Sequence, residues 1–248
     1  KTLKEAAIKT GAPKHCIQWI EYPSIEATAA LMNHPGVSLV LATGGSAMVK
    51  AAYSTGKPAL GVGPGNVPCY IEKTANIERA CTDLMLSKTF DNGMICASEQ
   101  TVIVDEEIAD KFEKFMVENN CYFLNKDEEE KVSKYVIKPE SRALNPVIVG
   151  QSATYIAKEA GINVPPKTKI LIAPIPDATP EYPLVFEKLS PVLSYIKVQN
   201  CLQGFKMCQK VLKLGGLGHS AVIHSENNDI INEFGKIMKV GRVISNSP

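Results

Sequence analysis

The sequence has no long apolar run, almost no net charge and few histidines. No stretch approaches the roughly 18 apolar residues that a membrane helix needs, so we expect no transmembrane span. The 27 lysines and arginines nearly cancel the 26 aspartates and glutamates. The formal charge of +1 therefore gives no electrostatic reason to expect nucleic acid or an anionic membrane as a partner, although small anionic ligands remain possible.

The sequence also lacks cysteines and histidines at the spacing of a metal site. The 7 cysteines contain no Cys-x-x-Cys pair and form no zinc-ligand pattern with the 4 histidines, so we expect no metal. An odd number of cysteines at irregular spacing indicates reduced thiols, as in cytoplasmic proteins. The cysteines are Cys16, Cys69, Cys81, Cys96, Cys121, Cys201 and Cys208.

An alternation of helical and extended patterns is present instead. The chain has 248 residues, 45% of them hydrophobic, enough for one large domain or two small ones. The patterns predict helices over 2–9, 24–33 and 46–55 and strands over 17–21, 37–42 and 59–62. Ser24 is the expected N-cap of the second helix. The apolar run 37–42 is typical of a strand buried on both faces of a parallel sheet.

The rest of the chain continues the pattern. We predict helices over 76–89, 106–119, 127–135, 201–213 and 227–239, and strands over 101–104, 169–173, 193–198, 221–224 and 242–245. Such alternation predicts an α/β fold with an open parallel sheet, an architecture shared by nucleotide-binding folds and by proteins that bind no nucleotide. We expect two domains, residues 1–66 and residues 67–248.

Cys96 is the candidate nucleophile. It lies in residues 90–100, FDNGMICASEQ, just after an Asn-Gly turn in which Gly93 allows close approach of a ligand to the backbone. A cysteine attacks carbonyl carbon as the thiolate, which nearby backbone N–H groups or cations stabilise. For a cysteine in general, a small buried residue is the commoner interpretation.

Residues 90–100 resemble the active-site segment of aldehyde dehydrogenases, most closely the coenzyme A-acylating branch found in bifunctional aldehyde-alcohol dehydrogenases. Five further segments resemble the same family in the same order, so the resemblance covers essentially the whole chain. They are 42–46 (ATGGS), 61–71 (GVGPGNVPCYI), 187–192 (EKLSPV), 215–221 (GGLGHSA) and 241–248 (GRVISNSP). The resemblance implies a partial Rossmann-type parallel sheet in residues 1–66, the C-terminal part of a dinucleotide-binding domain, followed by an α/β catalytic domain in residues 67–248.

The resemblance also implies a cofactor site. Gly45 and Ser46 lie in a strand-to-helix turn that relatives place beside the cofactor pyrophosphate; taken alone, the turn is more simply a βα connection. Gly63 is assigned to the same site. Glu187 matches a glutamate whose carboxylate accepts hydrogen bonds from two hydroxyls of the nicotinamide ribose. The alternative interpretation of Glu187 is an exposed charge. The implied cofactor is NAD.

An absence separates acylation from hydrolysis. In hydrolytic relatives a glutamate acts as general base toward water, and alignment puts Val62 in its place. Valine cannot accept a proton, so the resemblance implies an acyl-enzyme that survives until a thiol such as coenzyme A attacks. A hydrolytic or phosphorylating semialdehyde dehydrogenase is the alternative within the superfamily.

Two further side chains are candidates in the catalytic site. His219 matches a histidine of the acylating branch and has two interpretations: it helps to deprotonate the incoming thiol, or it is a histidine hydrogen-bonded at the start of a strand. Asn92 is expected to orient the Cys96 loop. The Cys96 backbone N–H is the expected oxyanion contact, because the family's asparagine donor would precede Lys1. The other three histidines are expected to be structural or exposed.

The resulting hypothesis is a cytoplasmic, fermentative, NAD-dependent acetylating acetaldehyde dehydrogenase, a reversible oxidoreductase whose substrates are a small aldehyde or acyl-CoA. We expect the chain to be a fragment of a homo-oligomeric protein, lacking the first half of the nucleotide domain and a C-terminal strand used in dimer contacts. An iron-dependent alcohol dehydrogenase half would follow in a bifunctional parent. A non-catalytic module of a larger assembly is the alternative from another class.

Overall fold

The computed structural model describes residues 1–139 and 141–248. The chain divides into two compact units, Lys1–Gly63 and Pro64–Pro248, and each is described by itself. No helix among the described residues is long and apolar enough to cross a membrane. All seven cysteines are free thiols.

The first unit is a small α/β unit. It comprises α1 (Thr2–Lys9), α2 (Ile25–Asn33), β1 (Val40–Thr43), α3 (Ser46–Tyr53) and β2 (Ala59–Val62). Strands β1 and β2 are parallel, with Val40 opposite Ala59. Ser24 is the N-cap of α2, as the sequence predicts, because its side chain accepts a hydrogen bond from the Ala27 N–H.

Two predictions about this unit are wrong. Residues 17–21 form no strand: they are bends and coil, Trp19 is 56% exposed, and the two-stranded sheet of the unit contains only β1 and β2. Without a neighbouring strand, an apolar run cannot satisfy its backbone as a strand. The strand expected over 37–42 begins at Val40 and is buried on one face only, since Ala52 of α3 covers Val40 and Ala42 while Leu41 is 72% exposed.

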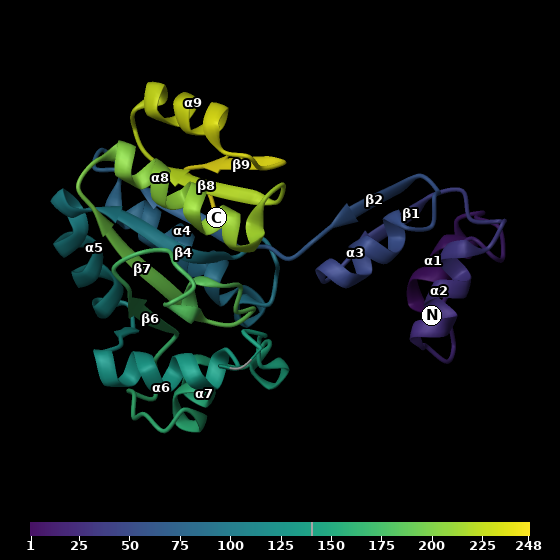
Figure 1. The fold of residues 1–248 in the computed structure, drawn as a ribbon, viewed down its shortest axis with the longest axis horizontal. Helices are drawn as coiled ribbons and strands as arrows, with labels where there is room; N and C mark the ends of the chain where they lie inside the picture. The colour runs from purple at the N-terminus through teal and green to yellow at the C-terminus, as the bar shows by residue number, and fades with distance from the viewer. Residues whose placement is uncertain (140) are drawn as a thin grey trace. The chain divides into compact units, whose positions relative to one another are not determined.

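The second unit is built on a sheet of seven parallel strands in the order β5-β6-β7-β4-β3-β8-β9 (Figure 1). This confirms the predicted α/β class with a parallel sheet. The strands are β3 (Val67–Ile71), β4 (Glu99–Asp105), β5 (Cys121–Phe123), β6 (Ile170–Pro174), β7 (Val192–Val198), β8 (Ser220–His224) and β9 (Arg242–Ser245).

Helices cover both faces of this sheet. The α-helices are α4 (Ile77–Thr89), α5 (Glu106–Glu118), α6 (Lys126–Val136), α7 (Ala153–Glu159), α8 (Cys201–Val211) and α9 (Asn228–Ile237). Helices α4 and α5 share one core with the sheet, and α8 and α9 share a second core on the opposite face. Helices α6 and α7 cover the end near β6 (Figure 1). Short helical segments are η1 (Phe90–Gly93), η2 (Pro146–Ile148), η3 (Pro183–Val185) and the π-helical η4 (Leu212–Gly216).

The periodicity of α5 shows how the sequence specifies this packing. Ile108, Phe112 and Met116 recur at helical spacing and are buried against the sheet. The Phe112 ring stacks on Tyr195 of β7 at a centroid distance of 5.3 Å. Burying each such side chain contributes about 1.5–3 kcal/mol to folding, so the amphipathic face rather than helix propensity holds α5 in place.

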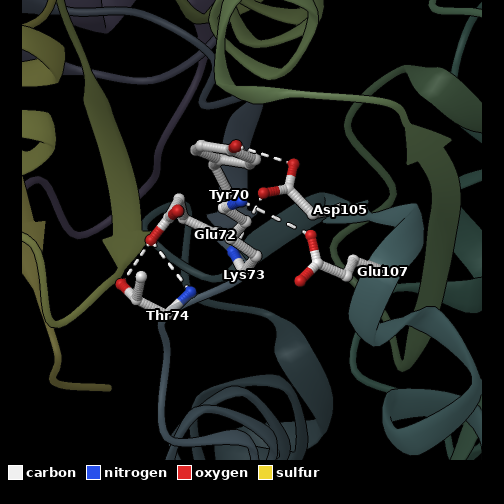
Figure 2. A network of polar contacts seen from close by, with 6 residues as sticks. All are labelled: Tyr70, Glu72, Lys73, Thr74, Asp105 and Glu107. Atoms are coloured by element: carbon white, nitrogen blue, oxygen red, sulfur yellow. Dashed lines mark hydrogen bonds and ion pairs between the residues drawn. The ribbon is translucent and has the colours of Figure 1, made fainter.

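The carboxyl edge of the sheet carries a network of polar side chains, shown in Figure 2. The Asp105 carboxylate, at the end of β4, accepts from the Tyr70 hydroxyl at 2.7 Å and the Lys73 N–H at 2.9 Å. The Glu72 carboxylate, just after β3, accepts from the N–H and hydroxyl of Thr74 and from the Ser225 hydroxyl. Because Glu72 and Asp105 are both almost fully buried, these donors offset the cost of removing two carboxylates from water.

Candidate active site

Four segments of the second unit that precede neighbouring strands carry Gly65 and three of the predicted site residues. Glu187 lies before β7, Cys96 before β4, Gly65 before β3 and His219 before β8, and these strands are adjacent in the order β7-β4-β3-β8. Parallel strands begin at the same edge of a sheet. The four segments, far apart in the sequence, therefore converge at the amino edge, opposite the polar network of Figure 2.

The segments of Glu187, Cys96 and His219 all approach Gly65. Its N–H donates to the Glu187 Oε1 atom at 2.8 Å. A Cβ atom built on Gly65 would lie 2.1 Å from the Cys96 carbonyl oxygen and 3.3 Å from the His219 Nε2 atom. No side chain fits there, so only glycine allows β3 to begin this close to the Cys96 loop. The sequence points to this residue through the Gly63–Pro64–Gly65 motif, but the predicted site did not include Gly65.

A turn with left-handed backbone conformation precedes Cys96 and positions it at the site. Asp91, Asn92 and Gly93 have φ values of 49°, 51° and 68°, a conformation that aspartate, asparagine and glycine adopt at the lowest cost. A Cβ on Gly93 would lie 2.8 Å from the Ser190 carbonyl oxygen. Cys96 follows the turn and is half-buried, and its N–H donates to no protein acceptor within the described ranges.

Asn92 ties this turn to a neighbouring loop. Its side-chain amide donates to the Gly150 carbonyl oxygen at 2.9 Å, and the Gly150 N–H donates to the Leu189 carbonyl oxygen at 3.1 Å. The contact supports the loop that carries Cys96. Because the side chain is engaged with Gly150, its geometry favours a positioning contribution over contact with reacting atoms.

His219 is held at the start of β8. Its N–H donates to the Gly216 carbonyl oxygen, and its carbonyl oxygen accepts from the Arg242 N–H. Its Nδ1 atom lies 3.1 Å from the Ser220 hydroxyl, while Nε2 faces Gly65. Burial, and secondly the charge of Arg242, lowers the pKa of His219, which favours a neutral imidazole near pH 7. His219 is thus a hydrogen-bonded residue just before the strand, and one of its ring nitrogens faces the site.

Glu187 is half-buried, and its carboxylate is balanced by several groups. Burial raises its pKa, whereas the Gly65 N–H, Lys188 and Lys88 lower it, in that order. Lys88 and Lys188 are themselves fully buried. The N–H group and the two lysines offset part of the effect of burial, and the pKa of Glu187 remains raised above its ordinary value.

The Lys188 Nζ atom binds the backbone just before Glu187 and in β4, and burial lowers its pKa. It donates to the carbonyl oxygens of Gln100 (2.9 Å), Phe186 (3.0 Å) and Leu184. The Gln100 side chain accepts from the Lys188 N–H at 3.0 Å and donates to the Ser98 carbonyl oxygen at 3.0 Å. Gln100 thereby connects the segment after Cys96 with the segment around Glu187. Sequence analysis missed these residues, since no local pattern marks a buried lysine.

Gly45, Ser46, Gly63 and Val62 belong to the first unit. Gly45 is the N-cap of α3, Ser46 is the first residue of that helix, and both are exposed. The first N–H groups of a helix have no partner within it and favour anions. A Cβ on Gly45 or Gly63 would meet no atom within 4 Å. The turn therefore fits a phosphate group. Val62 ends β2 with no ionisable group to offer.

No group of three or more potential metal-ligating His, Cys, Asp and Glu residues occurs in the part of the chain that the structure describes. His224 is buried at the end of β8, and burial lowers its pKa to about 4. Its position is that of a structural residue.

The family model for the aldehyde dehydrogenase family matches residues 2–248. The chain belongs to this family. An aldehyde-alcohol dehydrogenase of Streptococcus pneumoniae serotype 4 is 50% identical to this aldehyde dehydrogenase chain, and the match covers all of the present chain. The chain spans 29% of that relative.

Solved structures of aldehyde dehydrogenases match the fold closely. An acetylating aldehyde dehydrogenase from Geobacillus thermoglucosidasius superimposes with a TM-score of 0.95 at 44% identity, over 99% of this chain and 54% of that one. A Rhodopseudomonas palustris propionaldehyde dehydrogenase with bound propionyl-CoA gives a TM-score of 0.90 at 31% identity, over 99% and 54% of the two chains. The predicted aldehyde dehydrogenase-like fold is confirmed.

Proposed function

We propose that this chain carries the catalytic residues of an NAD-dependent, CoA-acylating aldehyde dehydrogenase. The reaction converts acetaldehyde, NAD and coenzyme A reversibly to acetyl-CoA and NADH through a thioester on Cys96. The observation that supports it best is the meeting of Cys96, Glu187 and His219 around Gly65. The similarity to acetylating and propionyl-CoA-bound enzymes supports the same reaction.

In this proposal Cys96 and its own backbone perform the addition step. The Cys96 thiolate attacks the aldehyde carbon, and the carbonyl oxygen becomes negatively charged. The Cys96 N–H has no protein acceptor in the described part of the chain and is available to stabilise that oxygen. NAD, when bound, supplies the hydride acceptor that converts the adduct to the thioester.

Glu187 and the turn of α3 are the proposed contacts of the cofactor. The Glu187 carboxylate accepts from the Gly65 N–H through one oxygen and would accept ribose hydroxyls through its remaining lone pairs. The N-terminus of α3, with Gly45 and Ser46, would hold the pyrophosphate, and Gly63 would leave room beside it. We accordingly propose the cofactor role for residues 1–66 and the catalytic role for 67–248.

In this proposal, Val62 disfavours hydrolysis of the thioester. At the position where hydrolytic relatives carry a base, β2 ends in an aliphatic side chain. Water is a poor nucleophile unless a base accepts its proton. The thioester is therefore expected to wait for coenzyme A and to yield acyl-CoA.

Several attributes of the whole protein belong to the same proposal. We propose a cytoplasmic, fermentative enzyme, which the free state of all seven cysteines supports. We also propose a homo-oligomeric parent with an alcohol dehydrogenase half, on the similarity to an aldehyde-alcohol dehydrogenase.

Product analysis of the full-length protein tests the proposal. The protein is incubated with acetaldehyde and NAD, with or without coenzyme A, and NADH, acetyl-CoA and acetate are quantified. We expect sustained NADH formation only with coenzyme A, matched by acetyl-CoA. Turnover that ignores coenzyme A and releases acetate would reject acylation, and the absence of any NADH would reject aldehyde oxidation.

A further inference from the structure

The Ser220 hydroxyl lies between His219 and Arg242. Ser220 begins β8 opposite Arg242 of β9 and is 2% exposed. Its Oγ atom lies 3.2 Å from Arg242 Nε and 3.1 Å from the terminal Nη2 atom of the same side chain. On the other side, Oγ lies 3.1 Å from His219 Nδ1. Three nitrogen atoms thus surround one oxygen.

The hydrogen atoms can be assigned by counting donors and acceptors. A serine hydroxyl has two acceptor lone pairs and one hydrogen, and a guanidinium group only donates. The two Arg242 N–H groups occupy both lone pairs of Ser220. The serine hydrogen therefore points to His219 Nδ1, which must accept it. In a neutral imidazole that accepts at Nδ1, the proton resides on Nε2.

The alternative states of His219 fit this arrangement poorly. A proton on Nδ1 would place a third donor on an oxygen with two lone pairs and leave the serine hydrogen without an acceptor. An imidazolium would do the same and would add a second positive charge beside Arg242. The lowered pKa of His219, caused by burial and secondly by Arg242, agrees with the neutral form.

We propose that Ser220 and Arg242 hold neutral His219 with its proton on Nε2, so that His219 faces Gly65 and the Cys96 loop as a hydrogen-bond donor and not as a base. The catalytic part of this proposal rests on the proposed acylating function, whereas the position of the proton follows from the hydrogen bonds. Ser220 and Arg242 are positioning residues, because they act through the histidine. The direction of Nε2 toward Gly65 puts the donor at the place where Cys96 and Glu187 also converge.

The donor has a defined part in acyl transfer. Coenzyme A loses its thiol proton to solvent and attacks as the thiolate. The new bond joins its sulfur to the acyl carbon, the bond between that carbon and Cys96 Sγ breaks, and Cys96 leaves as a thiolate. No electrons are exchanged with a third partner. The His219 Nε2–H stabilises the coenzyme A thiolate as it arrives, or as it leaves in the reverse direction, without accepting a proton.

Two substitutions at position 219 separate donor from base in the full-length protein. Glutamine offers an N–H near the position of Nε2 but cannot act as a base at neutral pH, and alanine offers neither. We expect His219→Ala to slow acyl transfer from Cys96 to coenzyme A about 100-fold, and His219→Gln to stay within about tenfold of wild type. Equal losses in both variants would overturn the proposal.

A double-mutant cycle tests the positioning residue. We expect Ser220→Ala to slow the same step about tenfold in the wild-type background, because the imidazole can then place its proton on either nitrogen. It should cause no further loss in the His219→Gln background, since glutamine has no tautomer to select. The same tenfold loss in both backgrounds would show that Ser220 acts independently of His219.

A matched control, Ser225, lies just after the carboxyl end of the same strand. The Ser225 hydroxyl donates to Glu72 and accepts from the Asn227 N–H, so Ser225→Ala should lower stability and leave acyl transfer unchanged. A wild-type protein that forms no acyl-CoA would reject the proposed function itself. If His219→Gln does not fold, a histidine methylated on Nδ1 in the Ser220→Ala background replaces it. Its neutral Nε2 only accepts, so activity should fall, and retained activity would establish a base.

Discussion

The two edges of the seven-stranded sheet are formed by the same strands but leave different groups unpaired. At the carboxyl edge, Glu72 and Asp105 accept from side-chain and backbone donors. At the amino edge, Asn66 Oδ1, Ser98 Oγ and Ser190 Oγ are buried without a hydrogen-bond partner in the described part of the chain. The satisfied polar groups of the carboxyl edge belong to the scaffold, whereas the unsatisfied ones of the amino edge lie where we propose that ligands bind.

The division is not complete. His224 Nε2, at the carboxyl edge, and Thr179 Oγ1, in the segment after β6, are also buried and unpartnered within the described residues. Glu72 and Ser225, which lie beside His224, are hydrogen-bonded to each other. Four substitutions test whether the two edges of the sheet differ in this way.

Cys96→Ser should abolish the reaction. A serine hydroxyl is a far weaker nucleophile than a thiolate at neutral pH, so the rate of NADH formation should fall by about 1,000-fold or more. Steady-state assay of the full-length protein measures it. Cys201→Ser is the matched control, because Cys201 is also half-buried but lies on α8; it should keep wild-type rates. A Cys96→Ser variant with wild-type turnover would remove this residue from the mechanism.

Gly65→Ala should damage the amino edge through the backbone. The added Cβ would lie 2.1 Å from the Cys96 carbonyl oxygen, and this atom cannot rotate away as a flexible side chain would. We expect a stability loss of about 1–3 kcal/mol and an activity loss of about 100-fold from the displaced loop. Urea denaturation and steady-state kinetics measure the two effects.

The control for Gly65 is Gly235→Ala. A Cβ at Gly235 in α9 would meet nothing within 4 Å, and alanine favours a helix interior by roughly 0.5–1 kcal/mol over glycine. It should therefore hold or raise stability at unchanged activity. Similar behaviour of the two variants would mean that the close approach of Gly65 to the Cys96 loop is unimportant.

Asp105→Asn should affect stability alone. An asparagine retains one acceptor oxygen, so either the Tyr70 hydroxyl or the Lys73 N–H would face an amide donor. The free energy of unfolding should fall by about 1–3 kcal/mol, while the kcat and KM of the folded enzyme stay at wild-type values. The matched control is Glu107→Gln, which removes an exposed ion pair with Lys73 and should cost less than about 1 kcal/mol. A raised cofactor KM in Asp105→Asn would show that the two edges are coupled.

Lys88→Met should flatten the pH dependence of stability. Burial lowers the pKa of Lys88 from 10.5 to about 7. Between these values the unfolded chain binds one more proton than the folded chain, so the free energy of unfolding rises with pH, by at most ~1.4 kcal/mol per pH unit. Urea denaturation at several pH values measures the slope, which should be smaller in the variant. Exposed Lys236 gives the control: Lys236→Met should keep the wild-type slope.

Local patterns predicted most of the secondary structure. The helix over 106–119, the cap at Ser24 and the strands over 59–62 and 242–245 follow from spacing and capping that neighbouring residues decide, and they agree with the structure. Strand β3, strand β5 and helix α7 were not among the predicted elements. Strand β5 and α7 are only 3 and 7 residues long, too short for a periodic signal. Strand β3 contains Pro68, which it accommodates at an irregularity in its register with β4.

The site divides in the same way. Cys96, Glu187 and His219 were identifiable as chemistry-bearing residues in motifs that resemble a family. Gly65 was visible as part of a motif, but its importance depends on an approach to Cys96 over 30 residues away in the sequence. Lys188 and Gln100 carried no local signal, because burial of a lysine is a property of the packed sheet rather than of its neighbours in the chain.

The amino-acid order alone determined the alternation of helix and strand, the formal charge of only +1, the lack of long apolar runs and the identity of the candidate reactive side chains. These properties depend on groups within a few residues of one another. The tertiary structure alone decided which strands are neighbours, and hence that four distant segments meet at one edge. It also decided which nitrogen of His219 carries the proton, since a hydroxyl and a guanidinium brought together by parallel pairing of β8 and β9 set that choice.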